Sequence, residues 1–270
     1  MAKAKYINGF TLGYSVSAKY VRDSDYHCEN DYEIMYVRSG SRQVFVKDRS
    51  YVLTDGQLLF INKNELHKTS RINEKYERFV INFGDDYILP SVKRNMDVLF
   101  EHKLYAPSKL STIDKLFFSL LSEWEKLYKE NELAADNIKC YINILLTYFI
   151  RNHKHFSYTE KKTGNPSIER LLLYINENFK ENITLAVAAD MLHLSPHYLS
   201  QIFVKYTGFG FSEYLRAVRL EAAKDLLRNS KLPVTDVAHS CGFTDSNYFS
   251  AVFKKYTGIS PTRYRCLSSL

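Results

Sequence analysis

The segment YLSQIFVKYTG at residues 198–208 recurs as YFSAVFKKYTG at residues 248–258, and this repetition decides how the chain folds. The copies share their aromatic residues, a lysine and a final Thr-Gly pair in the same order. The match extends upstream, from Val187-Ala188 to Val237-Ala238, and downstream, from Tyr214 to Tyr264. A match of this length indicates one helical unit that occurs twice rather than a short chance motif. Two copies are too few for a solenoid.

Each copy predicts two helices joined by a short turn. In the first copy Thr184 can cap a short helix, and Ser195-Pro196 supplies an N-cap followed by proline at the first helical position. In the second copy Asp245 replaces Ser195 as the cap, and Gly242 gives flexibility at the turn. Both units therefore have the pattern of a helix-turn-helix motif.

The second helix of each unit has an apolar and a polar face at helical spacing. The apolar faces, which we expect in the core, are Leu199, Ile202, Phe203 and Tyr206 in the first copy and Phe249, Val252, Phe253 and Tyr256 in the second. The opposite faces carry His197, Ser200, Gln201 and Lys205, then Asn247, Ser250, Ala251 and Lys254. Short and hydrogen-bonding side chains of this kind suit base edges in the major groove of double-stranded DNA.

A long helix, predicted over residues 212–229, separates the two copies and would be roughly 27 Å long. Recognition helices that enter successive major grooves on one face of DNA lie about 34 Å apart, a distance of the same order. Cations near helix ends and turns are placed for phosphates, and they are Lys205, Arg216, Arg219, Lys254, Lys255, Arg263 and Arg265. A solvated charged face is the alternative explanation for each of them.

Residues 167–266 resemble the DNA-binding domain of the AraC family of bacterial transcription regulators. The matching residues of the first unit are residues 185–188, Ser195, Tyr198-Leu199, Phe203 and Gly208. Those of the second unit are Val237-Ala238, residues 241–243, 245–249 and 253–255, Thr257-Gly258, Ser260-Pro261 and Tyr264-Arg265. The resemblance implies two motifs that read a bipartite site, with base-facing positions at His197, Ser200, Gln201, Ser246, Asn247, Ser250 and Ala251. Because Ala251 stands where many relatives carry arginine, we expect weaker base readout from the second unit.

The first part of the chain, residues 6–83, predicts short strands separated by turns. The expected strands are residues 33–38, 42–46, 56–61 and 78–83, which are rich in β-branched and aromatic residues and suit a small antiparallel sandwich or barrel. From Ile113 to Tyr128 the apolar residues recur every three or four positions, and a second helix is expected over residues 134–152. This helical pair either forms a dimer interface or covers the open side of the barrel.

The strand-rich part resembles the cupin-type effector domain found in many AraC-family regulators. His27, Glu29, Glu33 and Gly40 keep the spacing of the first cupin motif, with Glu29 in place of its second histidine. Gly56, Asn62, Asn64 and His67 keep that of the second motif, with asparagines in place of its proline and glycine. The resemblance implies a small-molecule effector, with carbohydrate as one candidate class.

The effector residues expected from this resemblance are His27, Glu29, Glu33, Tyr36 and His67, with Phe45 and Phe60 as further stacking surface. The same imidazoles and carboxylates could instead hold a divalent transition metal, or they could serve the structure alone. We assign neither a metal nor a cofactor.

The expected fold class is α+β with two domains, a cupin-like β-barrel with two trailing helices and an all-α domain whose two helix-turn-helix motifs are joined by a long helix. The expected limits are 1–105 for the barrel, 106–152 for the helical pair as a dimerisation element, 153–166 for a linker and 167–270 for the DNA-binding domain. The net charge of +7 is a weak guide, because residues 166–270 hold 12 Lys and Arg against 9 Asp and Glu, a net charge of only +3.

The leading hypothesis is a transcription regulator that binds DNA as a homodimer and is not an enzyme. The alternative is a metal-dependent cupin enzyme, with dioxygenase or isomerase chemistry, fused to a DNA-binding domain. A DNA-repair protein with this module would need a reactive or zinc-bound cysteine cluster, but Cys28, Cys140, Cys241 and Cys266 are widely scattered. The N-terminus lacks the apolar core of a signal peptide, and the most apolar run, residues 141–150, is half the ~20 residues of a membrane span. We therefore expect a cytoplasmic protein without membrane contact.

Overall fold

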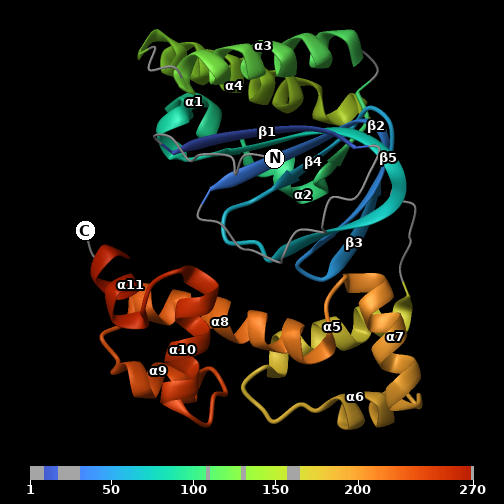
Figure 1. Cartoon of the computed structure of the whole chain (residues 1–270), viewed down its shortest axis with the longest axis vertical. Coiled ribbons are helices and arrows are strands. Elements are labelled where there is room, and N and C mark those ends of the chain that lie inside the picture. The colour runs from blue at the N-terminus through green and yellow to red at the C-terminus, as the bar shows by residue number, and fades with distance from the viewer. Residues whose placement is uncertain (1–8, 18–30, 108–109, 129–131, 157–164, 269–270) are drawn as a thin grey trace.

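An antiparallel sheet dominates the N-terminal half of the chain (Figure 1). The computed structural model describes residues 9–17, 31–107, 110–128, 132–156 and 165–268. Within these residues the strands are β1 (Phe10–Ser17), β2 (Tyr32–Val46), β3 (Arg49–Leu53), β4 (Gln57–Ile61), β5 (His67–Phe83) and β6 (Leu104–Tyr105). Their order is β1-β5-β2-β4-β6, and β3 pairs with the second half of β2. Three of the four predicted strands lie within β2 and β5, and the fourth, residues 56–61, matches β4 except for its first residue.

The long strands β2 and β5 pair with each other and bend together. Their register shifts between Val37 and Ser39 and again between Gly40 and Arg42. Gly40 sits at the bend with φ +88°, where a Cβ would lie 2.4 Å from the carbonyl O of Lys75. Only glycine fits this left-handed conformation and close approach.

The bend changes which residues face inward. Val37 before it and Val44 after it belong to the same buried cluster inside the barrel, although an odd number of positions separates them. In a regular strand such residues would point to opposite faces. The irregularity therefore keeps one continuous apolar interior along a strand that turns a corner.

The outer face of β2 contacts two different parts of the molecule. Before the bend, Ile34 and Tyr36 belong to the cluster that the following helices cover. After the bend, Phe45 is 1% exposed and belongs to the core of the C-terminal domain. One strand thus joins the barrel, the helical cover and the C-terminal domain.

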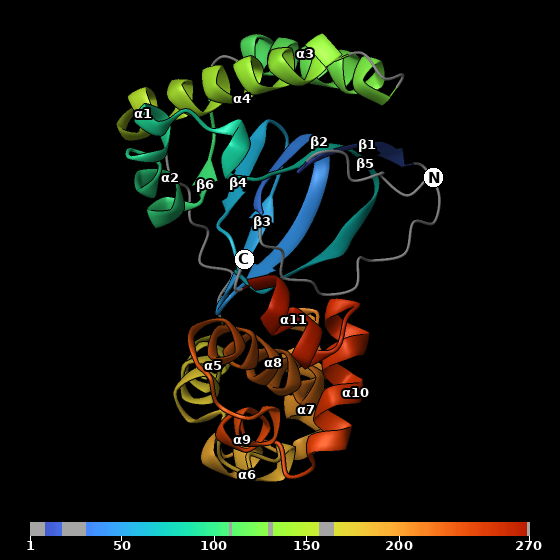
Figure 2. The ribbon, with the colours of Figure 1, turned by 90° about the vertical axis from the view of Figure 1, so that its left-hand side faces the viewer.

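Short helices surround β6, and a long antiparallel pair follows it. They are η1 (Asp85–Tyr87), α1 (Pro90–Lys93), α2 (Asp97–His102), α3 (Leu110–Tyr128), α4 (Glu132–Asn152) and η2 (His153–His155). α3 and α4 lie across the sheet on the side away from the C-terminal helices (Figure 2). The stripe of α3, formed by Ile113, Phe117, Leu120, Trp124 and Leu127, is at most 8% exposed. Of the two roles considered for this stripe, it performs the covering role within one chain.

The C-terminal domain contains helices α5 to α11 (Figure 1). They are α5 (Pro166–Asn178), α6 (Leu185–Met191), α7 (Pro196–Thr207), α8 (Phe211–Asn229), α9 (Val234–Ser240), α10 (Ser246–Thr257) and α11 (Pro261–Ser268). The predicted caps are confirmed. Ser195 accepts from the backbone N of Tyr198 at 3.3 Å, and Asp245 accepts from the backbone N of Asn247 at 2.7 Å.

The two helix-turn-helix units repeat with one difference in their turns. α7 and α10 are 50 residues apart, but α6 and α9 are 49 residues apart. In the first turn the backbone N of Leu194 donates to the carbonyl O of Ala189. In the second turn the backbone N of Phe243 donates to the carbonyl O of Ala238. The turn of the second unit therefore has one extra residue before its cap.

This shift corrects the predicted register of the first helices. Val187 is 52% exposed, whereas Ala188 and Ala189 are buried as Val237 and Ala238 are. The pairing of Val187-Ala188 with Val237-Ala238 was wrong by one residue, because an identical dipeptide happens to stand next to the structurally equivalent one. The left-handed position of each turn is His193 in the first unit, with φ +55°, and Gly242 in the second, with φ +83°.

The predicted linker lies between α4 and α5. α4 ends at Asn152, and Asn165 caps α5 by accepting from the backbone N of Ser167 at 3.0 Å. Residues 157–164 of the predicted linker are outside the described residues, and the domain limits stay a prediction. Among the residues described here, no helix has both the length and the apolarity to cross a membrane.

Candidate functional site

The polar face of α7 is accessible. His197, Gln201 and Lys205 are exposed and Ser200 is half-buried, whereas Leu199 on the opposite face is completely buried. The side chains of His197 and Gln201 are one helical turn apart, and their Nε2 atoms lie 3.2 Å from each other. The face that the sequence predicted for base edges is therefore free of intrachain packing.

α10 repeats this arrangement in the second unit. Its exposed residues are Asn247, Ala251, Lys254 and Lys255, and Ser246 and Ser250 are half-buried. Phe249 and Phe253 fill the core on the opposite face. Of the four other predicted phosphate contacts, Arg263 on α11 is exposed, and Arg216 and Arg219 on α8 and Arg265 on α11 are half-buried. Every predicted DNA-contacting residue lies at an accessible or partly accessible position, and contact with DNA itself stays a prediction.

One pair of exposed aromatic residues was overlooked in the sequence. Tyr198 and Tyr248 occupy equivalent positions near the starts of α7 and α10, and each is 50% exposed. The repeat already indicated a role for them, because an aromatic residue that both copies share outside the apolar stripe is not explained by core packing. Phenol hydroxyls donate readily to phosphate oxygens, so we add both residues to the predicted DNA interface.

Two of the predicted phosphate-facing cations have a structural role instead. Arg219 donates from Nε to the carbonyl O of Phe179 and from Nη2 to that of Glu181, both at 2.7 Å. Arg265 donates from Nη2 to the carbonyl O of Leu232 at 2.5 Å. These guanidinium groups brace the loops before α6 and α9, and burial lowers the pKa of Arg219.

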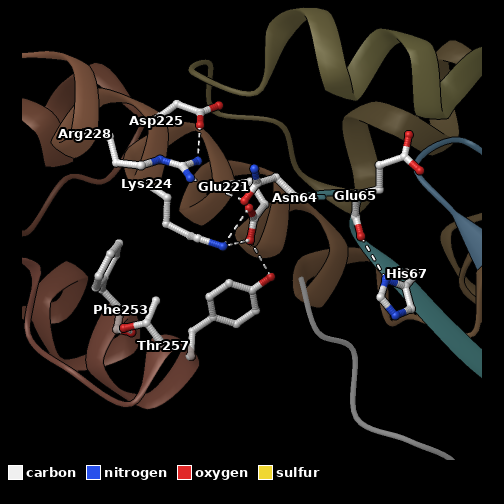
Figure 3. Close-up of polar contacts among 10 residues, drawn as sticks. Asn64, Glu65, His67, Glu221, Lys224, Asp225, Arg228, Phe253 and Thr257 are labelled. Carbon is white, nitrogen blue, oxygen red and sulfur yellow. Dashed lines mark hydrogen bonds and ion pairs between the residues drawn. The ribbon is translucent and has the colours of Figure 1, made fainter. Parts of the chain in front are cut away.

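The second unit is tied to α8 by a buried polar cluster (Figure 3). Lys224 is 4% exposed and its Nζ lies 3.1 Å from Oε2 of Glu221. The hydroxyl of Tyr256 donates to Oε1 of Glu221 at 2.7 Å. Thr257 donates to the carbonyl O of Phe253 at 2.9 Å, as Thr207 does to that of Phe203 at 2.7 Å in the first unit. The cluster fixes α10 relative to the spacer helix.

Inside the barrel, Glu33 and His67 form a polar cluster with Asn82. Glu33 and His67 are 4% and 3% exposed, and Nε2 of His67 lies 3.4 Å from Oε2 of Glu33. Asn82 donates to the same carboxylate oxygen at 3.0 Å. Nδ1 of His67 is 2.9 Å from the carbonyl O of Glu65, which can only accept, so Nδ1 carries a proton (Figure 3). Two predicted effector residues, distant in sequence, are thus brought together.

The other predicted effector residues are not part of this cluster. Tyr36 lies three positions after Glu33 on the same strand and therefore points to the opposite face. Its hydroxyl donates to Asp114 of α3 at 2.7 Å, and its ring lies 4.8 Å from that of Phe117. The prediction that Tyr36 shares a pocket with Glu33 and His67 is corrected accordingly. His27 and Glu29 lie outside the described residues.

The two further stacking candidates also face outward. Phe60 packs against Tyr105 and Phe149, with ring centroids 5.2 Å and 5.1 Å away. Phe45 packs in the C-terminal domain. Sequence alternation could not reveal the orientation of Phe45, because the bend at Gly40 reverses the phase of β2.

The cupin-like spacing has a backbone explanation. Gly56 has φ +78° and Asn64, which replaces the motif glycine, has φ +59°. Asparagine tolerates the left-handed region better than most residues, so the turn survives the replacement. Among the described side chains, no group of three or more His, Cys, Asp and Glu is arranged to hold a metal ion.

A buried ion pair lies next to the turn at Asn64. Nζ of Lys103 lies 2.5 Å from Oε2 of Glu65, and Nζ of Lys47 lies 3.3 Å from its Oε1. Burial alone would raise the pKa of Glu65, but the hydrogen bond and charge of Lys103 outweigh it and lower that pKa. Burial lowers the pKa of Lys103 in turn. The short contact between Lys103 and Glu65 favours the ionic pair, and Glu65 is held as a carboxylate with a lowered pKa.

The barrel and the first helix-turn-helix unit share an aromatic interface. The ring centroid of Phe45 lies 5.8 Å from those of Phe209 and Tyr214 and 6.5 Å from that of Tyr206. The hydroxyl of Tyr214 donates to the carbonyl O of Lys47 at 2.8 Å, and burial raises the pKa of Tyr214. This interface has the aromatic character of a protein core.

Polar contacts surround these rings. Gln43 donates to the carbonyl O of Tyr206 at 3.0 Å, which satisfies an acceptor in the last turn of α7. Nζ of Lys68 lies 3.5 Å from Glu213 on α8. Arg228, near the end of α8, bonds Asp225 at 2.6 Å and reaches Oδ1 of Asn64 at 3.5 Å (Figure 3). The barrel therefore touches both ends of the spacer helix.

Two family models match the chain. The AraC-like ligand binding domain matches residues 14–135, and the helix-turn-helix domain matches residues 188–266. The HTH-type transcriptional activator RhaR of Escherichia coli is 25% identical over 264 residues, which cover 94% of this chain and 92% of RhaR. The HTH-type transcriptional regulator YijO of Escherichia coli is 48% identical over 92 residues, which cover 34% of this chain and 32% of YijO.

Solved structures give two further likenesses. The C-terminal domain of the response regulator yesN from Fusobacterium nucleatum is 39% identical, with a TM-score of 0.36, and the match covers 37% of this chain and 99% of that chain. ToxT of Vibrio cholerae is 18% identical, with a TM-score of 0.40, and the match covers 96% of this chain and 99% of that chain. On the two matched domains and the named relatives, the chain belongs to the AraC family of transcriptional regulators, with an AraC-like ligand-binding domain and a helix-turn-helix DNA-binding domain.

Proposed function

We propose that α7 and α10 enter successive major grooves of a bipartite DNA site. The observation that carries this proposal is the repetition of an accessible polar face on two helices fixed to one spacer of 19 residues. The base-contacting residues are His197, Ser200, Gln201, Ser246, Asn247, Ser250 and Ala251. The phosphate-contacting residues are Lys205, Arg216, Lys254, Lys255 and Arg263, joined by the hydroxyls of Tyr198 and Tyr248.

The test is a comparison of two exposed residues with different proposed roles. Gln201→Ala is expected to reduce discrimination between the operator and random DNA by about 1–3 kcal/mol, because a bidentate contact to a base is lost. Lys255→Ala is expected to weaken binding to all sequences and to reduce the salt slope by about 0.9, because one phosphate contact is lost. Binding is measured by fluorescence anisotropy on sites mapped genome-wide. Equal loss on both DNAs for Gln201→Ala would show that α7 does not read bases.

We propose further that the barrel binds a small organic effector through Glu33 and His67, with His27 and Glu29 as candidates from the same motif. Carboxylate, imidazole and amide groups hydrogen-bond hydroxyls, which supports a carbohydrate as the class of effector. The relatives are named as transcription regulators, which supports a binding role for the barrel rather than catalysis. The proposed site of action is the cytoplasm.

Effector binding would act through the interface of Phe45 with the first helix-turn-helix unit. The strand that carries Glu33 also carries Phe45, so a change inside the barrel can shift the contact on its outer face. The arrangement is allosteric only if the effector changes the affinity for DNA. Operator titrations with and without effector measure this coupling, and superimposable curves would refute it.

We also propose that the protein is a homodimer joined through α4. The buried stripe of α3 is already used within the chain, but α4 presents Leu133, Cys140 and Ile144 outward at helical spacing. Leu133 is 71% exposed and Ile144 is 53% exposed. A second copy would bury both. Within this proposal the domain limits are 1–105, 106–152, 153–166 and 167–270.

A further inference from the structure

A cationic region lies inside the barrel, away from the cluster of Glu33 and His67. Arg78 on β5 pairs with Ser15 on β1 and Val37 on β2, and Val37 belongs to the interior cluster. Tyr76 lies two positions before Arg78 and thus on the same face. Its ring lies between two guanidinium groups, with Cζ of Arg42 at 4.1 Å and Cζ of Arg78 at 5.6 Å from the centroid.

Part of this region is buried without partners. Nε and Nη1 of Arg78 and the hydroxyl of Tyr76 are inaccessible to solvent and have no hydrogen-bond partner within the described part of the chain. Tyr76 is 3% exposed. Each buried donor without an acceptor costs about 1–3 kcal/mol. A protein that keeps three such donors together needs a compensating reason, and a bound acceptor supplies one.

The neighbouring carboxylate cannot serve as this acceptor. Glu77 lies between Tyr76 and Arg78 in sequence and points to the other face, where Arg38 binds it at 2.7 Å. The hydroxyl of Tyr14 donates to the same carboxylate at 2.5 Å. The unpaired donors therefore face the interior, opposite to the outer ion pair.

β1 presents small side chains to the side of β5 that carries these donors. Its residues that pair with the inward-facing side of β5 are Thr11, Gly13 and Ser15, whereas Phe10 and Leu12 on its outer side are packed beneath the helices. A Cβ added to Gly13 would meet only the carbonyl O of Val80, at 3.9 Å, among the described atoms. β1 therefore contributes little side-chain volume to the interior beside Arg78.

We propose that the effector carries a carboxylate that binds Arg78 and Tyr76, with the positive charge of Arg42 adding to the attraction. The inference rests on the proposed function, since it names the chemical class bound in the barrel. A carboxylate accepts from Nε and Nη of one guanidinium in a bidentate geometry and has lone pairs left for a phenol.

The rest of the effector extends toward the opposite polar end. Thr11, Glu33 and Asn82 lie four strand positions from Arg78, or about 13 Å along the sheet. Thr11 donates to Asn82 at 3.2 Å, and Asn82 donates to Glu33 at 3.0 Å. These groups suit hydroxyls rather than a second acid. The effector class is thus a hydroxylated carboxylic acid, such as a sugar acid, rather than a neutral sugar.

The experiment measures binding of charged and neutral partners to the full chain. The probes are D-gluconate and D-glucuronate, with D-glucitol and D-glucose as the neutral counterparts, tested by calorimetry at constant ionic strength. At least one acid is expected to bind saturably and its neutral counterpart at least tenfold more weakly. No binding of either acid, or equal binding of the neutral counterpart, overturns the proposal.

Variants separate a ligand site from a structural role. Arg78→Met is expected to weaken acid binding about 10- to 100-fold, since a charge-assisted bidentate contact is lost. It is also expected to raise the melting temperature without ligand, because unpaired buried donors are removed, and Tyr76→Phe should do so to a smaller extent. The control Arg38→Met removes the outer ion pair and should leave acid binding unchanged. A lower melting temperature of Arg78→Met with unchanged acid binding shows a structural role.

Operator binding is measured on the same samples. If wild-type protein binds DNA but neither acid, the proposal of a carboxylate effector is refuted and the proposed DNA binding stands. Protein that binds an acid but no DNA refutes the proposed DNA contacts instead.

Discussion

Glycines with the same backbone conformation carry different constraints in the two halves of the second helix-turn-helix unit. Gly242, in its turn, has φ +83°, and a Cβ there would lie 2.8 Å from the carbonyl O of Lys180. Gly258, after α10, has φ +82° with nothing within 4 Å of a Cβ. Alanine substitutions at these two glycines can therefore separate the free-energy cost of a left-handed backbone from that of a close contact.

Gly258→Ala is expected to cost about 1–2 kcal/mol in the free energy of unfolding, which is the penalty of the left-handed region alone. Gly242→Ala should cost about 1–3 kcal/mol more, because the added methyl displaces the loop before α6. Denaturant unfolding of both variants measures the difference. Equal losses would mean that this loop moves away freely.

The sequence predicted the residues of the proposed DNA interface but not the arginines that brace its helices. Gln201 and Asn247 were visible as polar residues opposite an apolar stripe, because helical periodicity is a local property. Arg219 and Arg265 had the same charge and similar positions, yet they bind backbone carbonyls of loops at least 33 residues away in sequence. No local pattern distinguishes a brace from a phosphate contact.

At the scale of elements, the ion pair of Lys103 and Glu65 joins the residue before β6 to the turn before β5. The pKa of Glu65 is lowered from its ordinary 4.5. A lowered carboxylate pKa stabilises the folded protein fully above the unfolded value and loses that contribution as the pH falls through the folded pKa. The stabilisation is therefore complete at neutral pH and decreases as the pH falls below about 4.5 and through the lower folded pKa.

Glu65→Gln is expected to flatten the dependence of stability on pH between about pH 5 and pH 3, because the titrating group is removed. Urea unfolding midpoints across this range measure it. Glu101→Gln, which changes an exposed carboxylate on α2, is the control and should follow the wild type. If Glu65→Gln also follows the wild type, the pair does not contribute to acid stability.

The second element-scale prediction concerns the junction of β2 with α7 and α8. Phe45→Ala removes a buried ring that contacts three others, and truncations of this kind cost about 3–5 kcal/mol. Because the ring joins two domains, we expect the single thermal transition to split into two in calorimetry. Tyr214→Phe loses the bond to the carbonyl O of Lys47 and the bond that Asn176 donates to the hydroxyl at 3.1 Å. It should cost about 1–3 kcal/mol and keep one transition. An unsplit transition in Phe45→Ala would show that the domains are not coupled through this ring.

At the scale of the whole molecule, the exposed apolar residues of α4 lie far from the DNA-binding domain (Figure 2). A homodimer through α4 would place two DNA-binding domains at the outer ends of the assembly. Each chain could then read its own bipartite site, and the dimer would bind DNA more tightly through multivalency.

Ile144→Asp is expected to convert the dimer to a monomer, because it buries a charge in the proposed interface. Light scattering during size-exclusion chromatography measures the mass. Leu173→Asp is a matched control, because Leu173 and Ile144 are both 53% exposed but lie on different domains. A dimer that persists in Ile144→Asp, or one that dissociates in Leu173→Asp, would place the interface elsewhere.

The sequence by itself determined many elements of this protein: the repeated helical unit, its caps at Ser195 and Asp245, the two faces of α7 and α10, and strand segments of β2, β4 and β5. It did not predict β1, β3 and β6. The predicted elements follow from backbone propensities and periodicities that act over a few residues. It also gave the spacing that joins Glu33 to His67.

Only the tertiary structure decided how the faces are used. The bend at Gly40 reverses the phase of β2, so that Phe45 leaves the barrel and packs in the C-terminal domain. The longer second turn shifts the register of α9, and strand pairing places Arg78 opposite Ser15 and Tyr76 opposite Gly40. These outcomes depend on contacts between distant segments. Once a bulge has shifted a strand, its alternation no longer predicts which residues face the interior.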